Sequence, residues 1–151
     1  MALSEAQRAV EDEEVPIGSV VVTREGRLIA KAHNQTRRLS DPTAHAEILA
    51  ITQAANALQS ERLTDTSLYV TIEPCSMCAG AIIQSRISRL VFGARDPKAG
   101  ACGSVFNLPD ERRLNHRVEV VGGLMEQESQ DLMQAFFRGL RENLDAPGLS
   151  R

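Results

Sequence analysis

Hydrophobic positions in the first part of the chain predict a helix followed by a hairpin. Residues 2–13 combine Ala, Leu, Gln and Glu, with apolar residues spaced for one face of a helix. Residues 17–23 and 28–31 are rich in strand-forming residues and flank an Arg-Glu-Gly-Arg turn, which indicates a β-hairpin. We interpret the acidic run 11–14 as the solvated end of the helix.

The rest of the chain alternates helical and extended patterns. The Asp-Pro-Thr turn at 41–43 is expected to cap a helix over 44–58. Pro74 suits the first turn of another helix, which runs to about residue 85. The remaining expected elements are strands at 67–72, 89–93 and 118–121 and a closing helix at 126–143.

This order of elements predicts an α/β fold. Strands that alternate with helices favour parallel pairs joined by right-handed crossovers, here added to an antiparallel hairpin. We therefore expect a three-layer α/β/α sandwich on a mixed sheet of about five strands. A length of 151 residues fits one domain, 1–151, and 42% hydrophobic with 25% charged residues is typical of a globular protein.

Charge and hydropathy narrow the location and the partners. The longest uncharged run, 48–60, is too short to span a bilayer, and the N-terminus lacks a signal-peptide core, so we expect a cytoplasmic protein with no membrane partner. The net charge of −3 points away from nucleic acid, but residues 86–117 hold seven basic against three acidic residues. Because phosphate attraction is local, this segment can still suit RNA.

Two short motifs supply a candidate metal site. Cys75 and Cys78 are three residues apart at a predicted helix start, so both thiols share one face, and a helix N-terminus favours thiolates. With His45 they make three ligands and leave a fourth position open, as in catalytic zinc sites. The cysteine pair alone is equally compatible with a structural zinc or a redox site. Because Cys102 as a fourth ligand would close the site, we expect it to be a buried filler.

Glu47 adds an acid–base group to this candidate site. Residues i and i+2 of a helix point about 200° apart, so Glu47 should not ligate beside His45. It can instead handle the protons of a water molecule at the open position. The pattern His-x-Glu with Pro-Cys-x-x-Cys is the signature of zinc-dependent nucleobase deaminases.

Further segments extend this similarity over nearly the whole chain. They include Asp-Pro-Thr-Ala-His-Ala-Glu at 41–47, Met-Cys-Ala-Gly-Ala at 77–81 and Phe-Gly-Ala-Arg-Asp at 92–96. On these residues the chain resembles the bacterial tRNA-specific adenosine deaminases (TadA), which belong to the cytidine deaminase-like superfamily.

The resemblance implies a mechanism and a substrate. One zinc ion would be held by His45, Cys75 and Cys78 with a hydroxide as fourth ligand, and Glu47 would shuttle protons while adenosine is converted to inosine. The implied substrate is the wobble adenosine in the anticodon loop of an arginine tRNA, and family members are homodimers. The implied substrate-binding residues are Asn34 and Ala46 for the base and Asp96, Lys98, Phe137 and Arg138 for the RNA.

Two other functions remain open. A deaminase of a free base such as guanine or cytosine would use the same motif without an RNA surface. A non-catalytic, zinc-dependent RNA-binding subunit would not require Glu47.

Several residues also have plain structural interpretations. Without the resemblance, Asn34 would be a turn residue. His33 and His116 are interpreted as hydrogen-bonded structural residues. Since a helix cannot bury the adjacent Phe136 and Phe137 on one face, one of them is expected in the core and the other facing a partner or a base.

Overall fold

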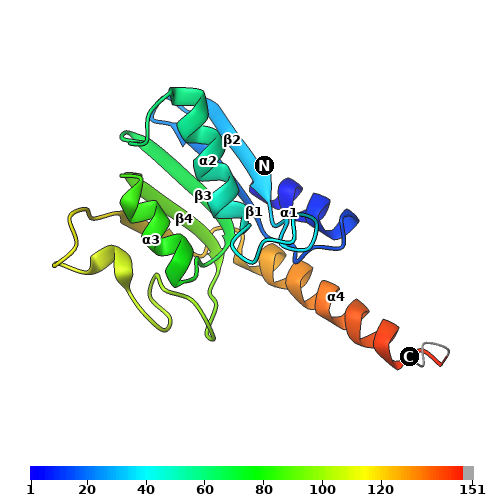
Figure 1. Cartoon of the computed structure of the whole chain (residues 1–151). Helices are drawn as coiled ribbons and strands as arrows, with labels where there is room; N and C mark the ends of the chain where they lie inside the picture. Colours follow the sequence, from blue (N-terminus) through cyan, green and yellow to red (C-terminus); the bar gives the residue numbers. More distant parts are fainter. Residues whose placement is uncertain (148–151) are drawn as a thin grey trace.

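Helices and strands follow one another in the order that the hydrophobic pattern predicts (Figure 1). The computed structural model describes residues 1–147. Its elements are α1 (Ala2–Glu11), β1 (Gly18–Thr23), β2 (Leu28–His33), α2 (Ala46–Leu58), β3 (Thr66–Ile72), α3 (Ser76–Gln84), β4 (Arg89–Ala94), the 3-10 helix η1 (Leu108–Asp110), β5 (Glu119–Gly122) and α4 (Glu126–Asp145).

The five strands form one mixed sheet in the order β2-β1-β3-β4-β5. Strand β1 runs antiparallel to both β2 and β3, as the predicted hairpin requires. Strands β3, β4 and β5 are parallel, with α3 as the crossover between the first two. Parallel strands need such a crossover because a tight turn can join only antiparallel neighbours.

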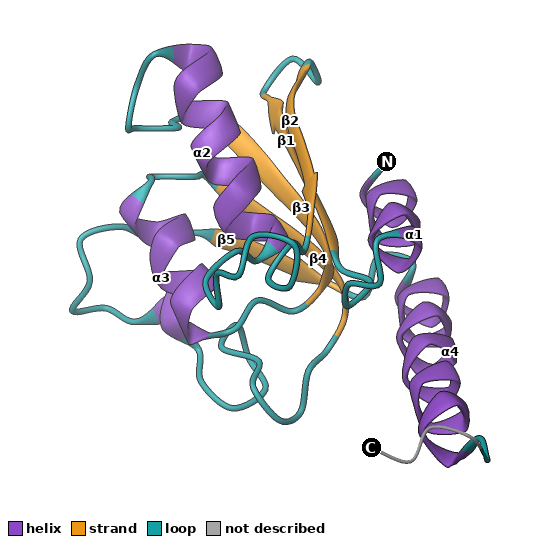
Figure 2. Ribbon diagram, turned by 45° about the vertical axis from the view of Figure 1, so that its right-hand side comes forward, coloured by secondary structure: helices purple, strands orange, loops and turns teal. Residues whose placement is uncertain are grey.

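Helices cover both faces of the sheet, which confirms the predicted three-layer sandwich. Figure 2 shows α2 and α3 on one face and α1 and α4 on the other. The main hydrophobic core lies between the sheet and the first pair of helices, where Leu68 and Leu90 of the strands meet Ala50 and Ile82 of the helices. This packing fixes the N-terminal ends of α2 and α3 relative to each other.

Gly18 allows α1 to lie directly against β1. A Cβ atom at this position would come within 2.0 Å of the carbonyl oxygen of Ala2 and 2.5 Å of the amide nitrogen of Ala6. Only a residue without a side chain permits this approach.

Two helix starts differ from the predicted ones. Helix α2 begins at Ala46 rather than at residue 44, with His45 as its N-cap residue. The expected cap from the 41–43 turn is wrong, because Asp41 Oδ1 accepts hydrogen bonds from the amide and hydroxyl groups of Thr43 at 2.8 and 2.7 Å and thus closes its own turn. Pro74 precedes α3, whose N-cap residue is Cys75.

The interpretation of 11–14 as a solvated helix end holds for the exposed residues 11–13 but is wrong for Glu14. Glu14 is buried and its carboxylate accepts hydrogen bonds from the amide of Arg38 and the hydroxyl of Thr36. Asp12 lies 2.9 Å from Nε2 of His33. These contacts anchor the loop after β2 to the end of α1, because a buried carboxylate needs such donors.

Both histidines outside the motif have the structural roles expected of them. The second ring nitrogen of His33 faces Glu5 at 3.2 Å, and His116 Nε2 lies 2.7 Å from the carbonyl oxygen of Ile87. Among residues 1–147, no helix combines the length and apolar character that crossing a membrane requires.

Candidate metal centre and active site

The three predicted ligands come together at the N-terminal ends of α2 and α3. His45 and Cys75 are the N-cap residues of these two helices and both have extended backbones, while Cys78 lies one turn into α3. His45 Nδ1 is 3.7 Å from Cys75 Sγ and 3.5 Å from Cys78 Sγ. All three ligand atoms lie within 4.8 Å of one another. The arrangement therefore forms a group that could hold a metal ion.

The spacing fits zinc in particular. Zn–S bonds of about 2.3 Å and Zn–N bonds of about 2.0–2.1 Å at tetrahedral angles place nitrogen and sulfur about 3.6 Å apart. The two observed nitrogen–sulfur distances, 3.7 and 3.5 Å, lie on either side of this value. Three ligands leave room for a fourth, which is characteristic of catalytic rather than structural zinc sites.

The electrostatics of the cluster favour a thiolate at Cys75. Hydrogen bonds from Cys78 and His45 lower the pKa of the Cys75 thiol to about 3. The hydrogen bond to Cys75, reinforced by the charge of Glu47, raises the pKa of His45, although burial opposes this. The interaction with Cys75 and burial raise the pKa of the Cys78 thiol. A thiolate already present at the helix N-terminus is a ready ligand for a cation.

Glu47 is a buried carboxyl group with an unsatisfied oxygen. It lies in the first turn of α2, is 4% exposed, and its Oε2 has no hydrogen-bond partner in the described part of the chain. Burial raises the pKa of Glu47, and this outweighs the opposing effects of its own backbone amide and His45. A buried carboxyl oxygen without a partner costs stability, so its presence beside three atoms that could hold a metal ion indicates a chemical role.

Asn34 and Ala46 meet beside this cluster. The side-chain oxygen of Asn34 accepts a hydrogen bond of 2.8 Å from the amide of Ala46, the first residue of α2. Asn34 is itself buried, and its backbone amide donates a hydrogen bond to the carbonyl oxygen of Ile17 at 3.1 Å. The two residues expected to bind the base are thus neighbours, and the amide of Ala46 is engaged by Asn34.

Cys102 is not part of the metal-ligating group. It is 4% exposed in the hydrophobic core, and burial, with a smaller effect of Glu73, raises the pKa of its thiol to about 12. A thiol of this kind is neither a reactive nucleophile nor a ready ligand. The prediction of a buried filler is confirmed.

Three of the predicted RNA-binding residues line one groove. Asp96 and Lys98 lie on the loop after β4, and Phe137 lies on α4; together with Met133 they border a cavity of about 380 Å³. The described lining of this groove does not include Arg138. Phe137 is 40% exposed and packs edge-on against the half-buried Phe136 at 5.4 Å between ring centroids. Phe137 is thus the more exposed of the two rings, but the expected core position for the other ring is wrong, because Phe136 is only half-buried and lies outside the main core cluster.

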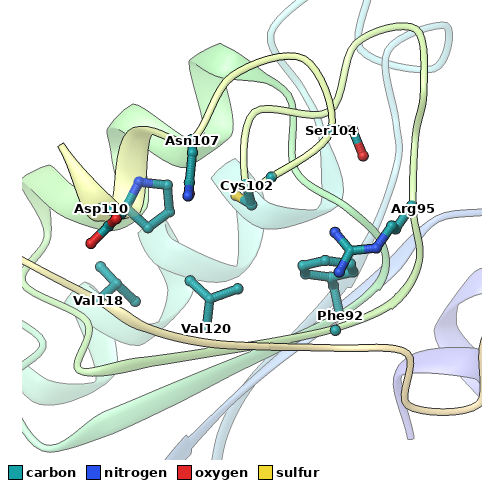
Figure 3. A pocket seen from close by; sticks show the side chains of 11 residues that line it. Phe92, Arg95, Cys102, Ser104, Asn107, Asp110, Val118 and Val120 are labelled. Atoms are coloured by element: carbon teal, nitrogen blue, oxygen red, sulfur yellow. The ribbon is translucent and has the colours of Figure 1, made fainter.

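A second hollow lies near the same loop. Figure 3 shows this cavity of about 620 Å³, with the guanidinium of Arg95 above the ring of Phe92 at 5.5 Å and Ser104, Asn107 and Asp110 along its border. His45, Cys75 and Cys78 do not line it, so it is distinct from the metal-ligating group.

Some basic side chains of the segment 86–117 pair with acidic side chains. Arg113 pairs with Glu111 at 2.7 Å, and Arg89 lies 3.8 Å from Glu119. The positive charges of this segment therefore do not all remain for phosphate groups.

Glu73 is the main residue of this region that the motifs do not identify. Its carboxylate accepts hydrogen bonds from the amides of Asp96, Cys102 and Ser104 and from the Ser104 hydroxyl. Burial alone would raise the pKa of Glu73, but these hydrogen bonds hold it below its ordinary value. Its position directly before Pro74 was visible in the sequence, but its partners lie more than 20 residues away.

Comparisons with known proteins agree with this geometry. The MafB19-like deaminase family matches residues 1–141. The tRNA-specific adenosine deaminase of Bacillus subtilis is 49% identical over 145 residues, which cover 96% of this chain and 89% of the relative.

Two solved structures extend the comparison to the fold. One, from a study of A-to-I editing by tRNA deaminases at the wobble position of transfer RNA, is 50% identical with a TM-score of 0.83 and covers 87% of this chain and 94% of that one. The other, guanine deaminase from Nitrosomonas europaea, is 26% identical with a TM-score of 0.79 and covers 89% of this chain and 80% of that one. With its His-Ala-Glu and Pro-Cys-x-x-Cys motifs joined in one cluster, the chain belongs to the family of tRNA-specific adenosine deaminases.

Proposed function

We propose that residues 1–151 act as one deaminase domain that converts adenosine to inosine at the wobble position of an arginine tRNA. The observation that supports this best is the meeting of His45, Cys75 and Cys78 beside the buried carboxyl group of Glu47, whose Oε2 has no hydrogen-bond partner among the described residues. The tRNA substrate follows from the named relatives, and the arginine anticodon from the resemblance of the motifs.

The three ligating residues would hold one zinc ion. His45 would bind through Nδ1, and Cys75 and Cys78 through their thiolates. When bound, zinc supplies Lewis-acid chemistry that makes water a usable nucleophile at neutral pH. Two thiolates also balance the charge of the ion, which limits the cost of burying it.

Glu47 would move the protons of the reaction. Hydrolysis adds water at the carbon that carries the adenine amino group and releases ammonia. Glu47 takes a proton from the attacking water, passes it to the ring nitrogen, and then assists protonation of the departing amine. A carboxyl group whose pKa is raised by burial holds a proton long enough to transfer it near neutral pH.

Asn34 and Ala46 would fix the base in the site. Since Asn34 Oδ1 already accepts the Ala46 amide, the side-chain NH₂ of Asn34 is the group of this pair that can donate to the base. A direct contact from Ala46 requires its amide to be shared between Asn34 and the base.

The groove between the Asp96–Lys98 segment and α4 would receive the anticodon loop. The exposed face of Phe137 can stack with an unpaired base next to the target, as aromatic residues do in single-stranded RNA recognition. Lys98 and Arg138 would pair with phosphates, and Asp96 can accept from a base or a ribose hydroxyl.

We also propose a homodimer that works in the cytoplasm. Val105 and Phe106, on the loop before η1, are 47% and 58% exposed, and Leu114 is 42% exposed. Exposed apolar side chains on both sides of η1 favour a protein partner for this segment. The cytoplasmic location rests on the tRNA substrate.

A substrate panel tests the proposed function. The zinc-loaded chain is incubated separately with an arginine tRNA that carries an ACG anticodon and with guanine, cytosine and adenosine. Inosine at the wobble position with no reaction of the free bases is the expected result. Ammonia released only from a free base would instead support the second candidate, which the similarity to guanine deaminase favours.

A further inference from the structure

Glu73 is a buried carboxylate that the proposed chemistry does not use. It follows β3 directly, is 3% exposed, and lies two residues before the ligand Cys75. Burial of a charged carboxylate is costly unless donors surround it. The residues that donate hydrogen bonds to this carboxylate therefore indicate its structural role.

All of these donors belong to the loop that follows β4. The carboxylate accepts the amides of Asp96 at 3.2 Å, Cys102 at 3.0 Å and Ser104 at 3.1 Å, and also the hydroxyl of Ser104. The two ends of the 96–104 loop are thus bound to one side chain. Hydrogen bonds to a charged group are among the stronger ones in proteins.

The middle of the same loop is built around this side chain. A Cβ atom on Gly100 would collide with the Glu73 carboxylate and would lie 2.5 Å from the carbonyl oxygen of Asp96, so the loop leaves no room for a side chain at this position. Gly100 forms an isolated antiparallel bridge with Cys75, and the amide of Ala101 donates to Pro74 O at 2.8 Å. The loop is therefore tied to the segment that carries a metal ligand.

This loop also carries two residues of the RNA groove. Asp96 Oδ1 accepts the amides of Lys98 and Ala99 at 3.0 and 3.2 Å, so the position of Lys98 depends on that of Asp96. The Asp96 amide in turn is bound by Glu73. A chain of contacts thus runs from the metal-ligating segment to the groove.

We propose that Glu73 is a positioning residue for RNA recognition, which holds the 96–104 loop so that Asp96 and Lys98 face the substrate at a fixed distance from the metal ligands. This proposal rests on the proposed function. A carboxylate is required at this position because both of its oxygens accept hydrogen bonds, and together they receive four converging donors. A glutamine has only one acceptor oxygen, and its NH₂ group would face N–H groups that it cannot bind.

The test compares Glu73→Gln with wild type in three measurements. Hydrogen–deuterium exchange of the free, zinc-loaded protein should become faster in peptides that cover 96–104 and stay unchanged in the strands. For an anticodon stem-loop, KM should rise about tenfold or more, because small displacements of binding groups are costly, while kcat stays within about twofold. Zinc content should remain one per chain.

Two variants complete the design. Ser104→Ala removes only the hydroxyl and retains the carboxylate, so it should show the same changes to a smaller extent even if Glu73→Gln folds poorly. Glu119→Gln, at an exposed carboxylate on β5, is the matched control and should change none of the three measurements.

Three outcomes would overturn the proposal. They are unchanged exchange in 96–104, faster exchange with an unchanged KM, and loss of zinc or of kcat at an unchanged KM. The exchange measurement needs no substrate, so it tests the hold of Glu73 on the loop even if wild type fails to deaminate tRNA, a failure that would count against the proposed function instead.

Discussion

The candidate metal cluster and the proposed RNA groove are built in different ways. In the cluster, two helix N-termini place His45, Cys75 and Cys78 together, and each ligand is fixed by its place in a helix. In the groove, the loop after β4 meets α4, and the contacts join residues about 40 positions apart. The cluster joins residues 30 and 33 positions apart through the packing of two regular helices on one core, whereas the proposed RNA groove joins a loop to a helix on the other face of the sheet.

The side chains of the cluster and those of the groove also differ in their exposure to solvent. Glu47 and Cys78 are 4% and 0% exposed, whereas Phe137 is 40% exposed. Buried groups gain strong electrostatic interactions with a bound substrate, while exposed groups gain mainly stacking and screened charge pairing. Substitutions in the cluster should therefore have larger effects than those in the groove.

The largest effect is expected for Cys78→Ser. Loss of a thiolate ligand should abolish zinc binding and turnover and lower the free energy of unfolding by about 4 kcal/mol or more, since metal binding is coupled to folding. Metal analysis and chemical denaturation with and without zinc measure both. Full zinc occupancy in the variant would contradict the ligand assignment.

Glu47→Gln should separate chemistry from metal binding. Removal of a general acid–base group reduces turnover by about 10²- to 10⁴-fold, while zinc content should stay at one per chain. Glu128→Gln, on the exposed start of α4, is the control. A near-normal rate in Glu47→Gln would exclude the proton-transfer role.

Phe137→Ala probes the groove without touching the cluster. Base–aromatic stacking contributes about 1–3 kcal/mol per base, so KM for the anticodon stem-loop should rise about tenfold while kcat changes little. Leu144→Ala, 79% exposed on the same helix, serves as the control. If the two variants behave alike, Phe137 does not contact RNA.

The contacts of Glu73 should appear in the pH dependence of stability. Hydrogen bonds hold its pKa below the ordinary value of 4.5, so its contribution is present above that pH and is lost as the pH falls through the lower folded-state pKa. On acidification below 4.5, wild type should lose more stability than Glu73→Gln. Equal losses in denaturation curves would show that this carboxylate contributes no such linkage.

The smallest effect is expected for Cys102→Ala. Because this thiol fills space in the core, its removal should cost about 1 kcal/mol and leave zinc content and turnover unchanged. Calorimetry and metal analysis provide the comparison with Cys78→Ser. Loss of zinc from Cys102→Ala would place it among the ligands.

The two regions also differ in how far the sequence predicts them. The hydrophobic pattern predicts the order of strands and helices and the three layers, because helical and strand periodicities are local properties. The ligating triad follows from residue spacing at helix starts. The start of α2 at Ala46 could not be predicted from the sequence, since Asp41 accepts a hydrogen bond from Thr43 within its own turn rather than from the helix.

Long-range contacts account for what the sequence leaves undetermined. Glu14 reads as part of a solvated acidic run, yet the loop of Thr36 and Arg38 folds over it. Glu73 likewise acquires its role only when residues 96–104 return to the sheet edge. Spacing along the chain carries no information about such pairs, because most of their donors are backbone amides that any residue except proline provides.

We propose that the cluster performs the chemistry while the groove holds the RNA. The most direct test is the affinity of zinc-loaded Glu47→Gln for an anticodon stem-loop with an ACG anticodon, measured by fluorescence anisotropy together with inosine formation on the same RNA. We expect a Kd within about twofold of that of wild type, with inosine formation reduced by about 10²-fold or more. A Kd weakened in parallel with the rate, or inosine formed at the wild-type rate, would contradict it.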